Sequence, residues 1–247
     1  MEAHSEDSNN KAESAVAPST SWFQNFWKKL TKPEMLKLIQ AVSGGVIATY
    51  YECHLISLIG AHWGPEAFDG LLAFFRPFYQ SRWFEPLLVG AVLTHLTVSG
   101  AEFIRVIKNK EELYDKVEPK SKMPSPWGLN QISSHLMAGG IFVHTSATRL
   151  PRLWLPTYAA NFRLVHSTLV DFPYIFYPYY TMLSSMMFYH FIYSNYLISR
   201  RYLLGRNDHK THSLRNKTLW YSIMASGVGM SVSIVMAFGG HYYRVRN

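Results

Sequence analysis

Five apolar stretches alternate with polar connections along the 247-residue chain. Each has about the 20 residues that a helix needs to cross the hydrocarbon core of a bilayer. They cover residues 41–61, 86–107, 132–150, 174–199 and 218–240. A buried core helix would explain any one of them, but it does not easily explain five in so short a chain. The pattern predicts an all-α membrane protein with five transmembrane helices in a bundle over residues 41–240.

The regions outside these stretches differ in character. Residues 1–20 are polar and acidic, which predicts a disordered tail and fits neither a secretory signal nor a matrix transit peptide. Residues 21–40 mix aromatic residues with lysines, as an amphipathic segment on a membrane surface does, although a solvated helix start is an alternative. The aromatic-rich loops at 62–85 and 151–173 are also expected at the membrane surface. Residues 241–247 form a short tail.

The charge pattern predicts a topology. The net charge is +8, and lysine and arginine gather in the N-terminal region and at 105–122 and 200–217. Because cytosolic loops carry an excess of these residues, the N-terminus is expected in the cytosol and the C-terminus across the membrane. Because the basic residues lie between apolar stretches, membrane topology explains the positive charge better than nucleic-acid binding does. No nucleic-acid partner is therefore expected. The single cysteine, Cys53, excludes a disulfide within the chain.

An internal repeat relates the first four stretches. The second and fourth share a spacing of four residues from histidine to serine and ten from histidine to arginine. The first and third share a spacing of eleven residues from serine to histidine. The two sets are His95, Ser99, Arg105 with His190, Ser194, Arg200, and Ser43, His54 with Ser133, His144. Two tandem copies of one helix pair, followed by a fifth helix, are therefore predicted.

The repeated histidines suggest a cofactor. The repeat places His54 and His144 at one depth, and His95 and His190 at another. Histidines on facing helices are how a bundle holds haem, so these four are candidate ligands of haem b. The alternative is that each neutral imidazole only hydrogen-bonds a neighbouring helix. Apart from iron in such a haem, no metal site is expected.

The helix boundaries weigh against two haems. At about 1.5 Å per residue, His95 and His190 lie roughly 15 Å from the arginines at their cytosolic ends. By the same rise, His54 is about 25 Å from Lys37 and His144 about 21 Å from Asn130. The two histidine layers would then be only roughly 6–10 Å apart, less than a helix diameter. Two macrocycles stacked at that distance would be crowded.

The residues of the repeat resemble a known family. The series His95, Ser99-Gly100 and Arg105, followed by Ser133, His144 and Arg149, resembles the transmembrane domain of the fungal mitochondrial outer-membrane adapter family, the Mdm-complementing proteins. The resemblance covers roughly residues 40 to 205. That domain is in turn distantly similar to the cytochrome b anchor of succinate dehydrogenase and fumarate reductase.

The resemblance implies a multi-pass protein of the mitochondrial outer membrane. It implies a role in membrane-lipid homeostasis or organelle contact, by recruiting a bridge-type lipid-transfer protein through a cytosolic Pro-x-Pro motif. The N-terminal tail contains only Pro18, so the family motif is missing there. The Pro-x-Pro on the predicted cytosolic face is Pro124-Ser125-Pro126, and Pro124 and Pro126 are the candidate partner-binding residues.

Three functions follow from these patterns. The first is an adapter in contact with membrane lipids and without catalysis. The second is a haem-bearing anchor that carries electrons. The third is a transporter that uses Glu52 and the histidines as a polar path. The chain has no Gly-x-Ser-x-Gly, phosphate-binding loop or His-Glu-x-x-His motif, so it is not expected to be an enzyme.

The last apolar stretch carries a face of small residues. Gly227 and Gly229 lie at its centre, with alanine and serine nearby. Small residues allow close helix packing in membranes. Gly229 is therefore expected at a helix contact, and Ile223 is expected to face lipid.

Overall fold

The computed structural model describes residues 24–25, 32–108, 124–155, 158, 160–206, 216–243 and 245. Within these residues the chain forms helices and no strand, which confirms the all-α prediction. The tail at 1–20 and part of the segment at 21–40 lie outside the described residues.

Long helices occupy all five apolar stretches. They are α2 (Pro33–Gly60), α4 (Phe84–Lys108), α6 (Pro126–Thr148), α9 (Pro173–Ile198) and α11 (Lys217–Phe238). Helix α2 begins before residue 41, so residues 33–40 continue into it as one helix. Proline at the first helical position favours the starts of α2, α6 and α9 because it needs no intrahelical N–H partner there. At the start of α6, the Ser125 hydroxyl accepts a hydrogen bond from the Gly128 amide at 3.0 Å.

Two of these helices are long and apolar enough to cross a membrane. They are α4, over Phe84–Arg105, and α11, over Lys217–Phe238. Only 11% of the α4 span and 33% of the α11 span are buried, so neither resembles the core helix of a soluble protein. The other three long helices have lower hydropathy because they carry more polar residues. Some of these lie inside the fold, including Ser43 and Ser57 of α2, Ser133 of α6 and Ser185 of α9.

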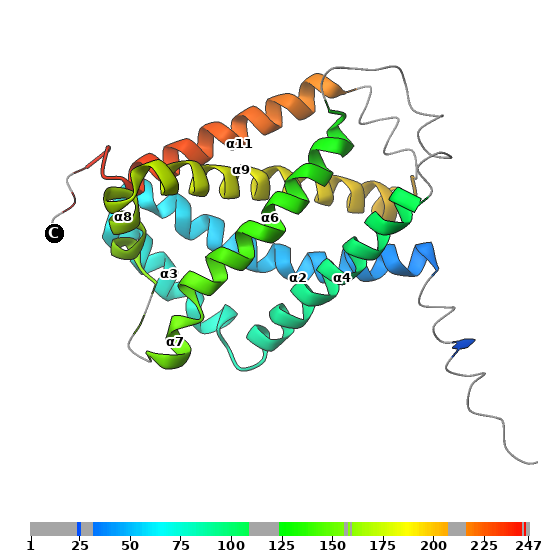
Figure 1. The fold of residues 1–247 in the computed structure, drawn as a ribbon, viewed down its shortest axis with the longest axis horizontal. Helices are drawn as coiled ribbons and strands as arrows, with labels where there is room; N and C mark the ends of the chain where they lie inside the picture. The colour runs from blue at the N-terminus through cyan, green and yellow to red at the C-terminus, as the bar shows by residue number, and fades with distance from the viewer. Residues whose placement is uncertain are drawn as a thin grey trace, which may run out of the picture.

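The long helices pack as two pairs with one added helix. Helix α2 packs against α4, α6 packs against α9, and α11 lies along α9 (Figure 1). In that view α4 and α6 run obliquely, whereas α2, α9 and α11 follow the long axis. The described part of the chain therefore has a first half, α2–α4, and a second half, α6–α9, with α11 on the outer side of the second.

The aromatic loops form a helical cap at one end. The first contains the 3-10 turn Ala61–Trp63 and α3 (Pro65–Tyr79). The second contains α7 (Pro151–Trp154) and α8 (Phe162–Asp171). Phe68 of α3 and Phe162 of α8 are buried against Phe238 at the end of α11. Gly64, with φ of 111°, makes the turn into α3, a conformation that residues with a side chain rarely adopt.

Candidate cofactor site

The structure brings the four repeated histidines together as two pairs. His54 of α2 faces His144 of α6, with the ring centroids 6.2 Å apart. His95 of α4 faces His190 of α9, with the centroids 6.4 Å apart. Each pair joins the first half of the bundle to the second. Equivalent positions of the repeat thus meet across the interface between the halves, as the sequence predicts.

The ring separations discriminate between two kinds of contact. A direct hydrogen bond between imidazoles, with nitrogens about 2.9 Å apart, places the ring centroids only about 5 Å apart. Two imidazoles on opposite sides of one metal ion, with bonds of about 2.0 Å, have centroids about 6.3 Å apart. Both observed pairs match the second value, which also lies within the 4.5–7 Å range of ordinary edge-on contacts between aromatic rings. Neither pair is joined by a hydrogen bond between its rings.

His95 has partners on the neighbouring helix. Its Nδ1 atom lies 3.2 Å from the Gln40 carbonyl oxygen and 3.3 Å from the Ser43 hydroxyl, both on α2. The Gln40 side chain also donates a hydrogen bond to Ser99, one turn beyond His95, at 2.9 Å. The alternative of interhelical hydrogen bonding, drawn from the sequence, is therefore realised at His95. These bonds use Nδ1 and leave Nε2 for another partner.

The surroundings of His190 contain unsatisfied polar atoms. The Asn130 backbone carbonyl faces the His190 ring, but Nδ1 is buried without a hydrogen bond. Nε2 has only a long contact of 3.4 Å with Ser194. Two nearby atoms are also buried and unpaired: the Asn130 side-chain oxygen, and the Tyr51 hydroxyl, whose ring packs on Phe191. Such atoms cost folding free energy unless a ligand or water pairs with them.

His54 and His144 have no hydrogen-bond partner for their rings among the described residues. The neighbour of His54 is instead aromatic: the Tyr50 ring is stacked on it at 5.7 Å. Tyr50 in turn meets Tyr79 of α3 edge-on at 5.3 Å. Structural hydrogen bonding therefore does not explain this pair.

The two pairs are farther apart than the helix boundaries indicated. His95 lies opposite Gln40 and Ser43, and a Cβ at Gly44 would be 3.3 Å from its ring. His54 is ten to fourteen residues further along the same helix, or about 15–21 Å. The sequence-based distance was wrong because it assumed that the basic ends of the helices lie at one depth. The observed spacing exceeds a helix diameter and separates two macrocycles.

Glycines of the long helices lie on two kinds of surface, the exposed outside and the helix contacts. A Cβ placed on Gly45 of α2, Gly100 of α4 or Gly139 of α6 would meet no other atom within 4 Å. In contrast, a Cβ on Gly140 would be 2.7 Å from Leu183 of α9. Neighbouring glycines of α6 thus have different roles, since Gly140 permits close packing and Gly139 borders open space.

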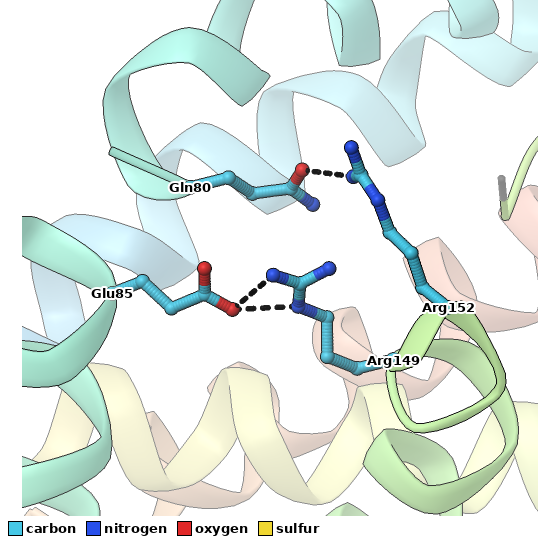
Figure 2. Close-up of polar contacts among 4 residues, drawn as sticks. All are labelled: Gln80, Glu85, Arg149 and Arg152. Atoms are coloured by element: carbon cyan, nitrogen blue, oxygen red, sulfur yellow. Dashed lines mark hydrogen bonds and ion pairs between the residues drawn. The ribbon is translucent and has the colours of Figure 1, made fainter. Parts of the chain in front are cut away.

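Two polar contacts, Arg149 with Glu85 and Arg152 with Gln80, form a polar clasp between the two halves of the bundle (Figure 2). The clasp lies beyond the His54–His144 pair. Arg149, at the end of α6, binds one Glu85 oxygen of α4 through Nε at 2.6 Å and through its terminal nitrogen at 2.5 Å. Arg152 of α7 donates to the Gln80 side chain at 2.7 Å. Both contacts join the first half to the second. Arg149 is therefore paired within the protein, a role that the sequence did not reveal.

The clasp borders the aromatic surroundings of His54. Burial raises the pKa of the Tyr79 hydroxyl, and the positive charges of Arg76 and Arg149 offset part of this rise. Tyr79 therefore connects these two guanidinium groups to Tyr50 and so to His54. Basic side chains thus lie at the end of the bundle nearer this pair, with Arg149 bonded to Glu85 and Arg76 to the Ala160 carbonyl.

Other predicted site residues lie elsewhere. Glu52 is exposed on the outer side of α2 and makes no hydrogen bond or ion pair, so it does not join the histidines in a polar path. Pro126 is buried, and its carbonyl accepts a hydrogen bond from Tyr189 at 3.0 Å. The Pro124 carbonyl accepts one from Tyr221 at 2.5 Å. In the structure this Pro-x-Pro segment starts α6 and contacts α9 and α11.

The chemistry of the donor set favours a cofactor that supplies its own donors. No group of three or more histidine, cysteine, aspartate or glutamate side chains in the described ranges is arranged to hold a metal ion. Each pair offers two imidazoles. Haem iron is held by four macrocycle nitrogens and needs only two axial protein ligands. The residues present therefore fit haem, with His54 and His144 as one axial pair and His95 and His190 as another.

The chain has no match among protein-family models, curated proteins or solved structures.

Proposed function

We propose that this protein is a membrane-embedded cytochrome of the b type, which binds two haem groups between the halves of its helix bundle. One observation carries the proposal. Both histidine pairs join the two halves, and their ring separations of 6.2 and 6.4 Å match two imidazoles on one metal ion. In each pair one imidazole comes from the first half of the bundle and one from the second.

The protein residues bind and orient the cofactors. Each half contributes one imidazole to each site, so ligation fixes one half against the other. The Gln40 carbonyl and Ser43 hydroxyl orient His95. Tyr50 covers one face of the His54 ring and excludes water from it. Haem held by His54 with His144, or by His95 with His190, would supply one-electron transfer.

The proposal includes a membrane location for all five long helices. Beyond the two that are apolar enough by themselves, α6 and α9 expose large apolar side chains such as Phe142 and Ile175. Their polar groups, including Ser133 and Ser185, are buried. Apolar side chains on the outside and polar side chains on the inside are the pattern expected for a helix bundle surrounded by lipid. The topology with a cytosolic N-terminus follows from the charge pattern.

The adapter function remains a prediction from the resemblance, as do lipid homeostasis and the mitochondrial outer membrane. A bridge-type lipid-transfer partner would require an accessible motif. Pro126 is buried, which does not favour it as part of that motif, whereas Pro124 is exposed while its carbonyl accepts a hydrogen bond from Tyr221.

An absorption spectrum tests the cytochrome proposal. The full chain is purified in detergent from cells supplied with haem, and bound haem is measured per chain as its pyridine complex. The expected result is a six-coordinate low-spin spectrum with two haems per chain. A colourless protein that also fails to take up added haem would sink the proposal.

A further inference from the structure

The hydrogen bonds around His95 determine which of its ring nitrogens carries the proton. The Ser43 hydroxyl donates to backbone carbonyls of its own helix, at 2.8 Å to Ile39 and 3.2 Å to Gln40. It therefore presents a lone pair to His95. The Gln40 carbonyl can only accept. Because both neighbours of Nδ1 are acceptors, Nδ1 carries the proton and Nε2 keeps its lone pair.

Among the other three histidines of the two pairs, His190 faces a comparable group, the Asn130 carbonyl, which occupies the repeat position of Gln40. The rings of His54 and His144 have no hydrogen-bond partner among the described residues, and the His190 Nδ1 atom is buried and unpaired. Ser133 occupies the same repeat position as Ser43 and makes the same kind of bond, to the Asn130 carbonyl at 2.9 Å. It has no hydrogen bond to His190. The repeat thus places a carbonyl beside both histidines of this pair, whereas a serine hydroxyl contacts the ring only at His95.

We infer that Gln40 and Ser43 are positioning groups for His95, and that they give the His95–His190 haem a lower reduction potential than the His54–His144 haem. The inference rests on the proposed function. Hydrogen-bond donation from the outer nitrogen makes an imidazole a more basic ligand. A more basic ligand stabilises ferric iron relative to ferrous iron, which lowers the potential.

Charged side chains lie at both ends of the bundle. Each end of the bundle has one arginine paired with a glutamate, Arg105 with Glu102 at 3.2 Å and Arg149 with Glu85. Each end also has further basic side chains, Lys37 at one and Arg152 at the other. Positive charge near either site raises the potential there. The hydrogen bonds to His95 distinguish its site, beside the aromatic surroundings of His54 at the other.

A redox titration of the haem-loaded protein tests the inference. Two separate transitions are expected for the unaltered chain, and loss of His95 in His95→Ala should remove the lower one. Ser43→Ala should raise the lower midpoint and leave the upper one in place. It should also weaken haem binding at that site by roughly tenfold, because the ring of a ligating histidine loses a hydrogen-bond partner.

Two further variants separate positioning from folding. Ser43→Thr keeps the hydroxyl and should restore the lower midpoint. Ser57→Ala removes another buried serine of α2, one that bonds only the Cys53 carbonyl at 3.0 Å, and should move neither midpoint. An equal shift of both midpoints by Ser43→Ala, an unchanged lower midpoint, or an effect of Ser57→Ala as large as that of Ser43→Ala would overturn the inference alone. Failure of the unaltered chain to take up haem would overturn the proposed function as well.

Discussion

The two histidine pairs share a register in the repeat but differ in their surroundings. His95 is tied to α2 by hydrogen bonds, and His190 lies among buried polar atoms without partners. The other pair lies against aromatic rings and close to the clasp of Glu85 and Arg149. A duplicated helix pair has thus kept the positions of its imidazoles while the residues around them have diverged. Haem ligation depends on the positions of the rings and is expected at both pairs. The reduction potential is expected to differ between them, because it depends on the surrounding residues.

Removing one ligand from each pair should have the largest effect. His144→Ala and His190→Ala should each abolish one of the two haem signals and leave the other, because each site needs both imidazoles. Haem content per chain should fall by half, measured as the pyridine complex. Loss of both signals from either single variant would show that the pairs form one site rather than two.

Packing of α11 against the second half offers the next test. A Cβ at Gly227 would lie 2.6 Å from Phe188, two residues before His190, whereas a Cβ at Gly229 would meet nothing. Gly227→Leu should destabilise the protein by about 1–3 kcal/mol through overpacking. Gly229→Leu is the matched control and should have little effect. Equal thermal stability of the two variants in detergent would count against this packing.

The same comparison corrects the sequence-based expectation for this helix. Gly229 was expected at the contact, and Ile223 was expected to face lipid. Instead Gly227 is buried at the contact, Gly229 is exposed, and Ile223 packs against the buried aromatic cluster of Tyr189, Tyr193 and Trp220. Composition indicated a small-residue helix but not which of two glycines, two positions apart, faces its neighbour.

Removing the Glu85–Arg149 ion pair should destabilise the protein less than overpacking α11. Arg149→Gln removes an ion pair whose two side chains are each about one-third exposed. Such a pair contributes about 1 kcal/mol or less because solvent screens it. Haem loss, followed spectroscopically during heating, should be faster at the His54–His144 site than at the other. Arg105→Gln at the opposite end is the control, and faster loss at the His95–His190 site in Arg149→Gln would contradict the assignment.

The smallest effect is expected at Ser133. Because its hydroxyl makes no bond to His190, Ser133→Ala should leave both redox midpoints close to those of the unaltered chain. Ser43→Ala provides the positive comparison. A shift at Ser133 as large as that at Ser43 would show that the repeat is symmetric in function as well as in sequence.

The sequence predicted the long helices and the pairing of the histidines because both depend on periodicity. Apolar stretches of sufficient length become helices, and a repeated spacing puts equivalent residues at matching depths. The sequence did not reveal that Gln40 lies opposite His95, because the axial offset between two helices depends on packing. The Glu85–Arg149 clasp was missed for a related reason, since it joins residues 64 positions apart whose connecting helices had first to be placed.

The spacing between the two pairs also has an electrical consequence. About 15–21 Å along α2 is at least half of a hydrocarbon core roughly 30 Å thick. Moving one charge across a whole membrane changes its energy by about 2.3 kcal/mol per 100 mV, so moving an electron between the pairs would change it by at least about 1.2 kcal/mol. In a polarised membrane, the voltage would therefore bias which of the two sites holds the electron.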